Sequence, residues 1–176
     1  MHWAVAELTR VMAPPAQGDE VDWERVRELS GVAFPEDYRD FVATYGGGSM
    51  DDLLVVLTPP VPGSAYGQLL DKPVLPPAGE RYPYPYPPHP EPGGLFPWGS
   101  TATADDVFWL CEGDDPDAWV TVVRKRQAHH GEEPWKRFDG GMAEFLLALV
   151  RGEFPNPFSQ RGFPSARPEY LGWREE

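Results

Sequence analysis

The segment 35–48 carries apolar side chains at helical spacing. Four of them recur at intervals of three and four residues and fall on one face of a helix: Tyr38, Phe41, Val42 and Tyr45. Pro35 suits the first helical position, where a missing N–H group costs nothing. The glycine run at 46–48 favours a stop followed by a turn. The pattern therefore predicts a helix whose aromatic stripe packs on a core.

Three further segments, 2–12, 23–29 and 142–150, show the same spacing. Their expected apolar faces are Ala4, Leu8, Val11 and Met12 in the first, Trp23, Val26 and Leu29 in the second, and Met142, Phe145, Leu146, Leu149 and Val150 in the third. Asp22 and Asp139 are the expected caps of the second and third helices, because aspartate is favoured at that position.

Apolar runs without helical spacing predict strands in the middle of the chain. The run 53–57 is typical of a buried strand. The segment 106–123 has two apolar, aromatic or β-branched runs on either side of a Gly-Asp-Asp-Pro-Asp loop, which predicts a β-hairpin. One more short strand is expected at 135–138.

The order of these elements favours an α+β fold. We expect a single domain over residues 1–155, with N-terminal helices packed on a mainly antiparallel sheet and a C-terminal helix. Residues 71–93 hold nine prolines, which exclude a helix or a central strand and predict a long loop insertion. Residues 156–176 have little periodicity and are expected to form an irregular tail.

The chain is strongly acidic, with 28 acidic and 15 basic side chains and a formal net charge of -13. Such a surface repels phosphate backbones, so we expect no nucleic-acid partner. It attracts a basic protein, although acidity also serves solubility alone. No signal-peptide pattern opens the chain, and the late apolar run 145–150 is too short for a bilayer. We therefore expect a cytoplasmic protein without a membrane partner.

The sequence offers no specific catalytic pattern. The glycine run follows a predicted helix and precedes two aspartates, which argues against a phosphate-binding loop. His2, His89, His129 and His130 lack metal-binding spacing, and we expect neither a metal nor a cofactor. The single cysteine, Cys111, lies in an apolar run and is expected to be buried and unreactive.

Carboxylates and tyrosines are the candidate binding residues. The carboxylates cluster in three predicted turns: Asp51 and Asp52; Asp105 and Asp106; Asp114, Asp115 and Asp117. Tyr82, Tyr84 and Tyr86 alternate with prolines in the 71–93 loop, where stiff exposed rings suit recognition. Solvated turns and an insertion without a role are the alternatives. An acid–base pair among the carboxylates also stays open. We predict that these ten side chains contact a protein partner through an acidic face and the Tyr-Pro loop.

Two longer segments carry a combined pattern. A helix with tryptophan, a glycine turn, Pro-x-x-Tyr, a Tyr-Gly-Gly stop and a strand ending at proline follow one another in 22–59. The matching residues are Trp23, Leu29, Gly31, Pro35, Tyr38, Phe41, Tyr45, Gly46, Gly47 and Pro59, with Pro97, Trp98, Gly99, Trp109, Asp115, Pro116 and Trp119 in the later segment 95–123. In this order they resemble the SUKH superfamily, which contains yeast cell-wall synthesis regulators and many bacterial immunity proteins.

The resemblance implies a single α+β domain without catalytic activity. It implies an immunity protein that binds and neutralises a cognate toxin of a bacterial toxin system, and the acidic charge of the chain suits a basic nuclease toxin. The alternatives are a regulatory scaffold that binds cellular partners and a hydrolase that uses a carboxylate pair. A neighbouring toxin gene would favour the immunity protein, whereas a cleft with two facing carboxylates would favour the hydrolase.

Overall fold

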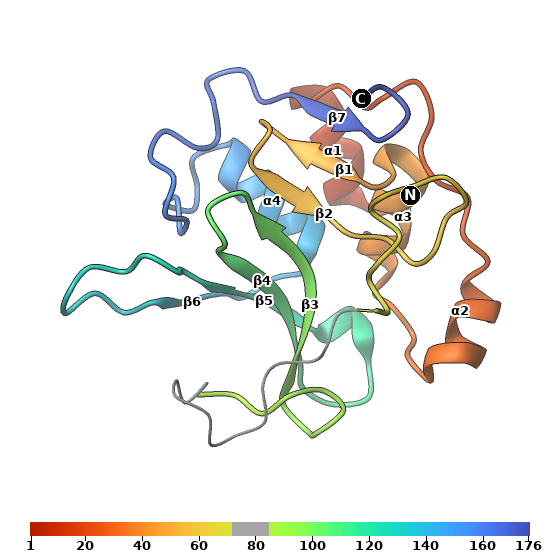
Figure 1. Cartoon of the computed structure of the whole chain (residues 1–176), viewed down its shortest axis with the longest axis horizontal. Helices are drawn as coiled ribbons and strands as arrows, with labels where there is room; N and C mark the ends of the chain where they lie inside the picture. The colour runs from red at the N-terminus through yellow and green to blue at the C-terminus, as the bar shows by residue number, and fades with distance from the viewer. Residues whose placement is uncertain (72–84) are drawn as a thin grey trace.

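Four α-helices and seven strands form in the residues that the computed structural model describes, 1–71 and 85–176 (Figure 1). The helices are α1 (Trp3–Val11), α2 (Trp23–Ser30), α3 (Glu36–Tyr45) and α4 (Met142–Val150). The strands are β1 (Gly48–Met50), β2 (Leu54–Val56), β3 (Gly94–Thr101), β4 (Asp106–Cys111), β5 (Val120–Arg124), β6 (Trp135–Phe138) and β7 (Tyr170–Gly172), and a short 3-10 helix, η1 (Pro116–Ala118), precedes β5. Neighbouring strands are antiparallel, and the α+β class predicted from the sequence is confirmed.

The sheet has the strand order β6-β5-β4-β3-β2-β1-β7. Because neighbouring strands run in opposite directions, the connections between them alternate between the two ends of the sheet. The turns 51–53, 102–105 and 125–134 lie at one end, which we call the Asp105 end. The connection 112–119 lies at the opposite end, which we call the Trp119 end. This alternation decides which of the predicted acidic turns can act together.

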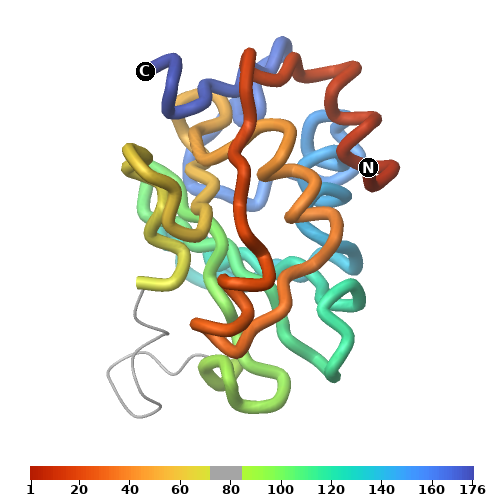
Figure 2. The backbone as a smooth tube through the Cα atoms, turned by 90° about the vertical axis from the view of Figure 1, so that its right-hand side faces the viewer, coloured from red at the N-terminus to blue at the C-terminus, as the bar shows by residue number. Residues whose placement is uncertain are grey.

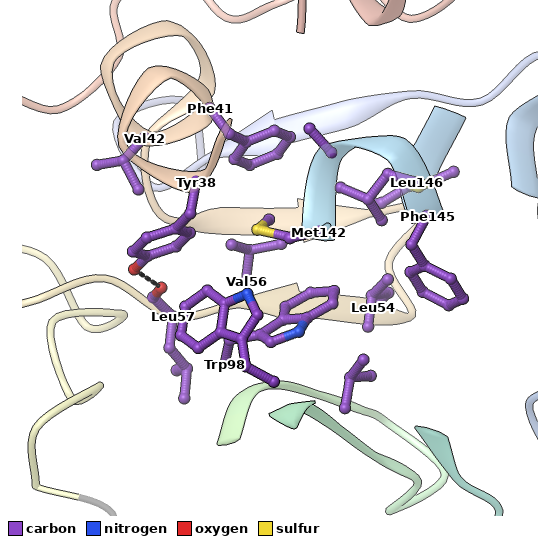
Figure 3. Close-up of a cluster of buried hydrophobic side chains, with 14 of the residues drawn as sticks. Tyr38, Phe41, Val42, Leu54, Val56, Leu57, Trp98, Met142, Phe145 and Leu146 are labelled. Carbon is purple, nitrogen blue, oxygen red and sulfur yellow. Dashed lines mark hydrogen bonds between the residues drawn. The ribbon is translucent and has the colours of Figure 1, made fainter. Parts of the chain in front are cut away.

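The main core lies between the helices and one face of the sheet. Helices α3 and α4 contact each other, and α1 contacts both (Figure 2). Figure 3 shows apolar side chains of α3 and α4 gathered over β2 and Trp98 of β3. The Tyr38 hydroxyl donates to the Leu57 carbonyl at 2.6 Å. The side chains predicted from the helical stripes to be core are at most 2% exposed: Tyr38, Phe41, Phe145 and Leu149. That prediction is confirmed.

The opposite face of the sheet holds a second, smaller cluster. Its buried members are Leu95, Phe108, Leu110 and Val122. Tyr86 packs on this cluster, with its ring centroid 5.6 Å from that of Trp135. The expectation that Tyr86 is an exposed ring is corrected, because the side chain is half-buried and helps to cover the sheet. Tyr82 and Tyr84 lie outside the described residues.

The C-terminal segment 156–176 is not an irregular tail throughout. Its residues 170–172 form β7, which pairs with β1 and extends the sheet. Tyr170 donates its hydroxyl to the Gly46 carbonyl at 2.8 Å, and Phe158 and Phe163 are buried in the main core. Strands of three residues have too few alternating positions to be recognised from sequence, which is why both β1 and β7 were missed.

The helix ends follow local signals only in part. Asp22 caps α2 as predicted, since its carboxylate accepts a first-turn N–H group at 3.0 Å. Asp139 does not cap α4, because its carboxylate accepts a hydrogen bond from Arg137 instead. At α4 the Glu144 side chain accepts from the N–H group of Gly141 at 3.0 Å. The predicted cap was wrong because the helix begins later, at Met142.

Two residues expected on apolar helix faces point to solvent. Val11 is 41% exposed and Leu29 is 66% exposed. Helix α2 buries only Val26 fully, so the face that contacts the body is narrower than the sequence pattern suggested. Helical spacing shows which side chains share a face, but the packing partner decides how wide the buried face is.

Candidate functional site: an acid-rimmed cleft

The predicted acidic turns divide between the two ends of the sheet. The Asp105 end carries Asp51, Asp52, Asp105 and Asp106, whereas the Trp119 end carries Asp114, Asp115 and Asp117. The structure therefore does not bring all the predicted carboxylates onto one acidic face.

Asp105 is completely buried, with 0% of its surface exposed. Its carboxylate accepts hydrogen bonds from the hydroxyl and backbone N–H groups of Ser159, the backbone N–H group of Arg126 and the hydroxyl groups of Thr101 and Thr103. Burial alone raises the pKa of Asp105, but these hydrogen bonds outweigh it and hold the pKa below its usual value. The prediction that Asp105 belongs to an exposed binding face is wrong, because the side chain joins three segments of the fold.

The other aspartates of the Asp105 end also have structural contacts. Asp51 and Asp52 both have left-handed backbone conformations, with φ of 50° and 51°. The Asp51 carboxylate accepts backbone N–H groups of the segment 165–169 at 2.7 and 2.9 Å. Asp106 forms an ion pair with Arg124 at 3.2 Å. Of the four predicted carboxylates at this end, Asp52 is the exposed one.

The 112–119 connection presents its carboxylates to solvent. Asp114, Asp115 and Asp117 are all exposed. Asp115 accepts the N–H group of Asp117 at 3.0 Å and so begins η1. Asp117 accepts the N–H group of Glu36 at 2.6 Å, which places its charge at the N-terminus of α3. These two hydrogen bonds hold the turn against the helix.

A cleft of about 360 Å³ opens beside this turn. Its walls come from the connection 31–33 after α2, the segment 89–92 before β3, and the stretch from Cys111 to Trp119. Glu91 and Asp114 line it, and two more exposed carboxylates of the same turn, Glu112 and Asp115, stand nearby in sequence. Arg27 of α2 is the basic residue in its lining. We call this feature the acid-rimmed cleft.

Aromatic and polar side chains form the interior of the acid-rimmed cleft. The ring centroid of His89 lies 5.3 Å from that of Phe96 and 6.3 Å from that of Trp119. Burial lowers the pKa of His89, so this imidazole is neutral at pH 7. Burial raises the pKa of the Cys111 thiol to about 12, so the thiol is protonated and is not an activated nucleophile. The cleft therefore offers apolar, aromatic contact area beside exposed negative charge, which is a composition suited to binding a protein.

The sequence predicted two parts of the acid-rimmed cleft, Asp114 and the segment 89–92 of the 71–93 loop, but not Trp119 or the connection 31–33. Within that segment His89 and Glu91 were not among the individually predicted binding residues, and the connection 31–33 was regarded as a turn. No local signal marks these residues, because they come from three segments that are brought together only by the fold. The only sequence feature that pointed toward this surface was the proline-rich segment 71–93, together with the acidic loop 113–117 of the predicted hairpin.

The segment 87–95 forms a tight wall of the acid-rimmed cleft. The N–H group of Leu95 donates to the Pro87 carbonyl at 2.9 Å, and the N–H group of Gly94 donates to the Glu91 carbonyl at 2.8 Å. A Cβ atom at Gly94 would lie 2.6 Å from the His89 nitrogen and 2.7 Å from the Glu91 carbonyl oxygen. Only glycine therefore allows the chain to fold back this closely.

Replacing Gly94 by alanine is expected to shift this wall and to lower the free energy of unfolding by about 1–3 kcal/mol. The clash involves backbone atoms that cannot rotate away. Urea unfolding measures the loss, and the His89 ring resonances report the displaced wall. Gly113→Ala at the same end measures a different cost, because its added Cβ meets no atom within 4 Å but its φ of 75° is unfavourable for alanine. A Gly94→Ala variant as stable as the wild type would contradict the steric argument.

Among residues 1–71 and 85–176, no group of three or more His, Cys, Asp or Glu side chains is placed to hold a metal ion. Within the same residues, no helix combines the length and apolar character that a bilayer span requires. Comparison of the chain with protein-family models, with curated proteins and with solved structures finds no match. The interpretation of the acid-rimmed cleft therefore depends on its geometry and on the resemblance described above.

Proposed function

We propose that the chain is a cytoplasmic, non-enzymatic protein-binding domain of the SUKH type, an immunity protein that neutralises a cognate bacterial toxin. In this proposal the arrangement of N-terminal helices, antiparallel sheet and C-terminal helix is the scaffold of that superfamily. The acid-rimmed cleft is the docking surface, and a basic toxin such as a nuclease is the partner.

The observation that carries this proposal is the combination of an apolar, aromatic cleft with exposed carboxylates at one end of the sheet. Trp119 and His89 supply contact area in its interior, while Glu91 and Asp114 supply negative charge in the same lining. Buried aromatic groups contribute most of the affinity at protein interfaces, whereas charges around them govern association rate and partner choice. A formal net charge of -13 extends the attraction of a basic partner beyond the cleft.

The direct test is protection. Where a neighbouring gene encodes a toxin domain, that domain is produced in bacteria with and without the chain, and survival is measured together with the affinity of the purified pair. Tight binding with rescue of growth supports the proposal. Failure to bind or to rescue contradicts it, and capture of cellular proteins by the acid-rimmed cleft in the absence of a toxin gene would favour a regulatory scaffold.

Neutralising the carboxylates of the acid-rimmed cleft is expected to slow association. The double variant Glu91→Gln, Asp114→Asn removes two exposed charges and no hydrogen bond among the described residues. We expect the association rate at low salt to fall about three- to tenfold, with a weaker salt dependence and a nearly unchanged dissociation rate. Stopped-flow fluorescence at several salt concentrations measures this.

The matched control is the double variant Asp52→Asn, Glu169→Gln, which removes two exposed carboxylates beside the turn 51–53 at the Asp105 end. Asparagine tolerates the left-handed backbone at position 52, so this variant changes charge without changing the fold. If both variants slow association equally, net charge rather than the acid-rimmed cleft steers the partner. If neither does, electrostatic steering by the carboxylates of the acid-rimmed cleft is excluded.

A further inference from the structure

A second hollow, of about 280 Å³, lies next to the acid-rimmed cleft between α2 and η1. The two share Arg27, Ala33 and Pro116 in their linings, so they form neighbouring parts of one surface. Trp23 and Phe34 give the hollow an aromatic wall, with ring centroids 6.0 Å apart. We call it the arginine hollow, because Arg27 and Arg39 both line it.

Five arginines of residues 1–71 and 85–176 form no ion pair, and two of them, Arg27 and Arg39, line this one hollow. Arg25, Arg124, Arg137, Arg151 and Arg174 all form ion pairs with carboxylates. Within residues 1–71 and 85–176, neither Arg27 nor Arg39 has a carboxylate within ion-pair distance. The Nε–H group of Arg39 is moreover buried and has no acceptor in that part of the chain. A buried donor on a charged group is costly to leave without an acceptor, so a movement of the Arg39 side chain that brings this group to an oxygen acceptor in the hollow would stabilise it.

The carboxylates in the lining do not fill this role. Asp117 is held by the N–H group of Glu36 at 2.6 Å, and Glu24 lies exposed in the first turn of α2. With two guanidinium and two carboxylate groups the lining is balanced in charge, so an anion is held there by hydrogen bonds to the guanidinium groups rather than by the general field. A carboxylate binds most tightly in the arginine hollow when it belongs to a molecule that also contacts the adjacent acid-rimmed cleft, because the second contact is then intramolecular.

We propose that Arg27 and Arg39 bind a carboxylate, supplied by an Asp or Glu side chain of the protein partner that docks on the acid-rimmed cleft. That the carboxylate belongs to a protein partner rests on the proposed function. The carboxylate site itself is a property of the free chain. Planar guanidinium groups match the two oxygens of a carboxylate, which lysine does not. A basic side chain of the partner would then lie in the acid-rimmed cleft, and an acidic side chain of the partner would lie in the arginine hollow. Two contacts of opposite charge would fix the position of the partner on this surface.

The carboxylate site is tested first on the free protein. Sodium acetate is titrated against the ¹⁵N-labelled chain while the Arg39 Nε–H resonance is followed, and sodium chloride at equal ionic strength is the reference. The resonance is assigned by its loss in Arg39→Gln. We expect a saturable shift with acetate, none with chloride, and the same response in Arg161→Gln, which removes an exposed arginine outside the hollow. No saturable response to acetate would overturn the site.

The carrier is tested with the partner. Arg39→Gln and Arg27→Gln are each expected to raise the dissociation constant for the toxin at least about tenfold, and Arg39→Lys is expected not to restore it. Arg27 is exposed on α2, so its variant remains informative if Arg39→Gln unfolds. If the Arg39→Gln and Arg27→Gln variants bind the toxin as tightly as the wild type, while the free wild-type protein binds acetate, then the site takes a free small carboxylate. That result would overturn the proposal that the partner supplies the carboxylate. If no toxin binds the wild-type chain, the proposed function fails while the acetate titration still decides the site.

Discussion

Phe145→Ala is expected to lower the free energy of unfolding by about 3–5 kcal/mol. The Phe145 side chain is 0% exposed and lies at the centre of an aromatic cluster under α4. Its ring centroid lies 5.7 Å from Phe138, 5.9 Å from Phe154 and 6.3 Å from Trp98. Truncation leaves a cavity that these rings, held by separate elements, cannot fill together. Such a loss is a large part of the stability of a single domain.

Chemical denaturation with fluorescence detection measures the Phe145→Ala effect. Leu29→Ala is the matched control, because Leu29 also lies in a helix but is 66% exposed. We expect the control to change the free energy of unfolding by less than about 0.5 kcal/mol. A loss of less than about 0.5 kcal/mol for Phe145→Ala would contradict the packing of α4 in the core.

Asp105→Asn is expected to lower the free energy of unfolding by about 2–4 kcal/mol, because an amide cannot accept all the hydrogen bonds that the buried carboxylate accepts. One of its two oxygens becomes an NH₂ donor that faces other donors. Asp106→Asn is the adjacent control. Asp106 is a partly exposed ion-pair partner of Arg124, for which a loss of about 0–1 kcal/mol is expected. Equal losses of unfolding free energy in the two variants would show that the hydrogen bonds of Asp105 do not stabilise the fold.

The pH dependence of stability gives a second measure of Asp105. Its folded pKa lies below the usual value, so the native carboxylate stays ionised at a pH where the unfolded chain already binds a proton. The stabilisation is complete above the unfolded pKa, about 3.9, and is lost as the pH falls through the folded pKa. We therefore expect the free energy of unfolding to fall more steeply below about pH 4 in the wild type than in Asp105→Asn. Parallel profiles would contradict a lowered pKa.

The C-terminal segment shows most clearly why part of the fold was not predictable. Three aspartates hold it in place: Asp105 through Ser159, Asp51 through 165–169, and Asp19 through Trp173 and Arg174. The partners in these contacts lie between 54 and 155 residues apart along the chain. A carboxylate in a turn has the same local sequence whether solvent or a distant segment satisfies it. The local sequence therefore did not show that these aspartates are bound to distant segments rather than exposed to solvent and to a partner.

The acid-rimmed cleft and the arginine hollow illustrate the same limit at the level of a site. Asp114 was recognised as an exposed turn carboxylate because a Gly-Asp-Asp-Pro-Asp loop is a local pattern. Arg39 was not recognised, since in sequence it is one charged residue of an amphipathic helix. Its position in a hollow that Arg27 also lines depends on how α2 packs beside the 112–119 connection.

Local periodicity was enough to predict several elements of this protein. The stripe of α3, the apolar face of α4 and the hairpin β4–β5 were predictable because each is set by the spacing of side chains within about 20 residues. Tertiary structure alone decided the seventh strand, the burial of Asp105 and the joining of three segments into the acid-rimmed cleft. The physical reason is that hydrogen-bond satisfaction and burial depend on which distant groups are brought into contact, and one segment of sequence does not specify its partner.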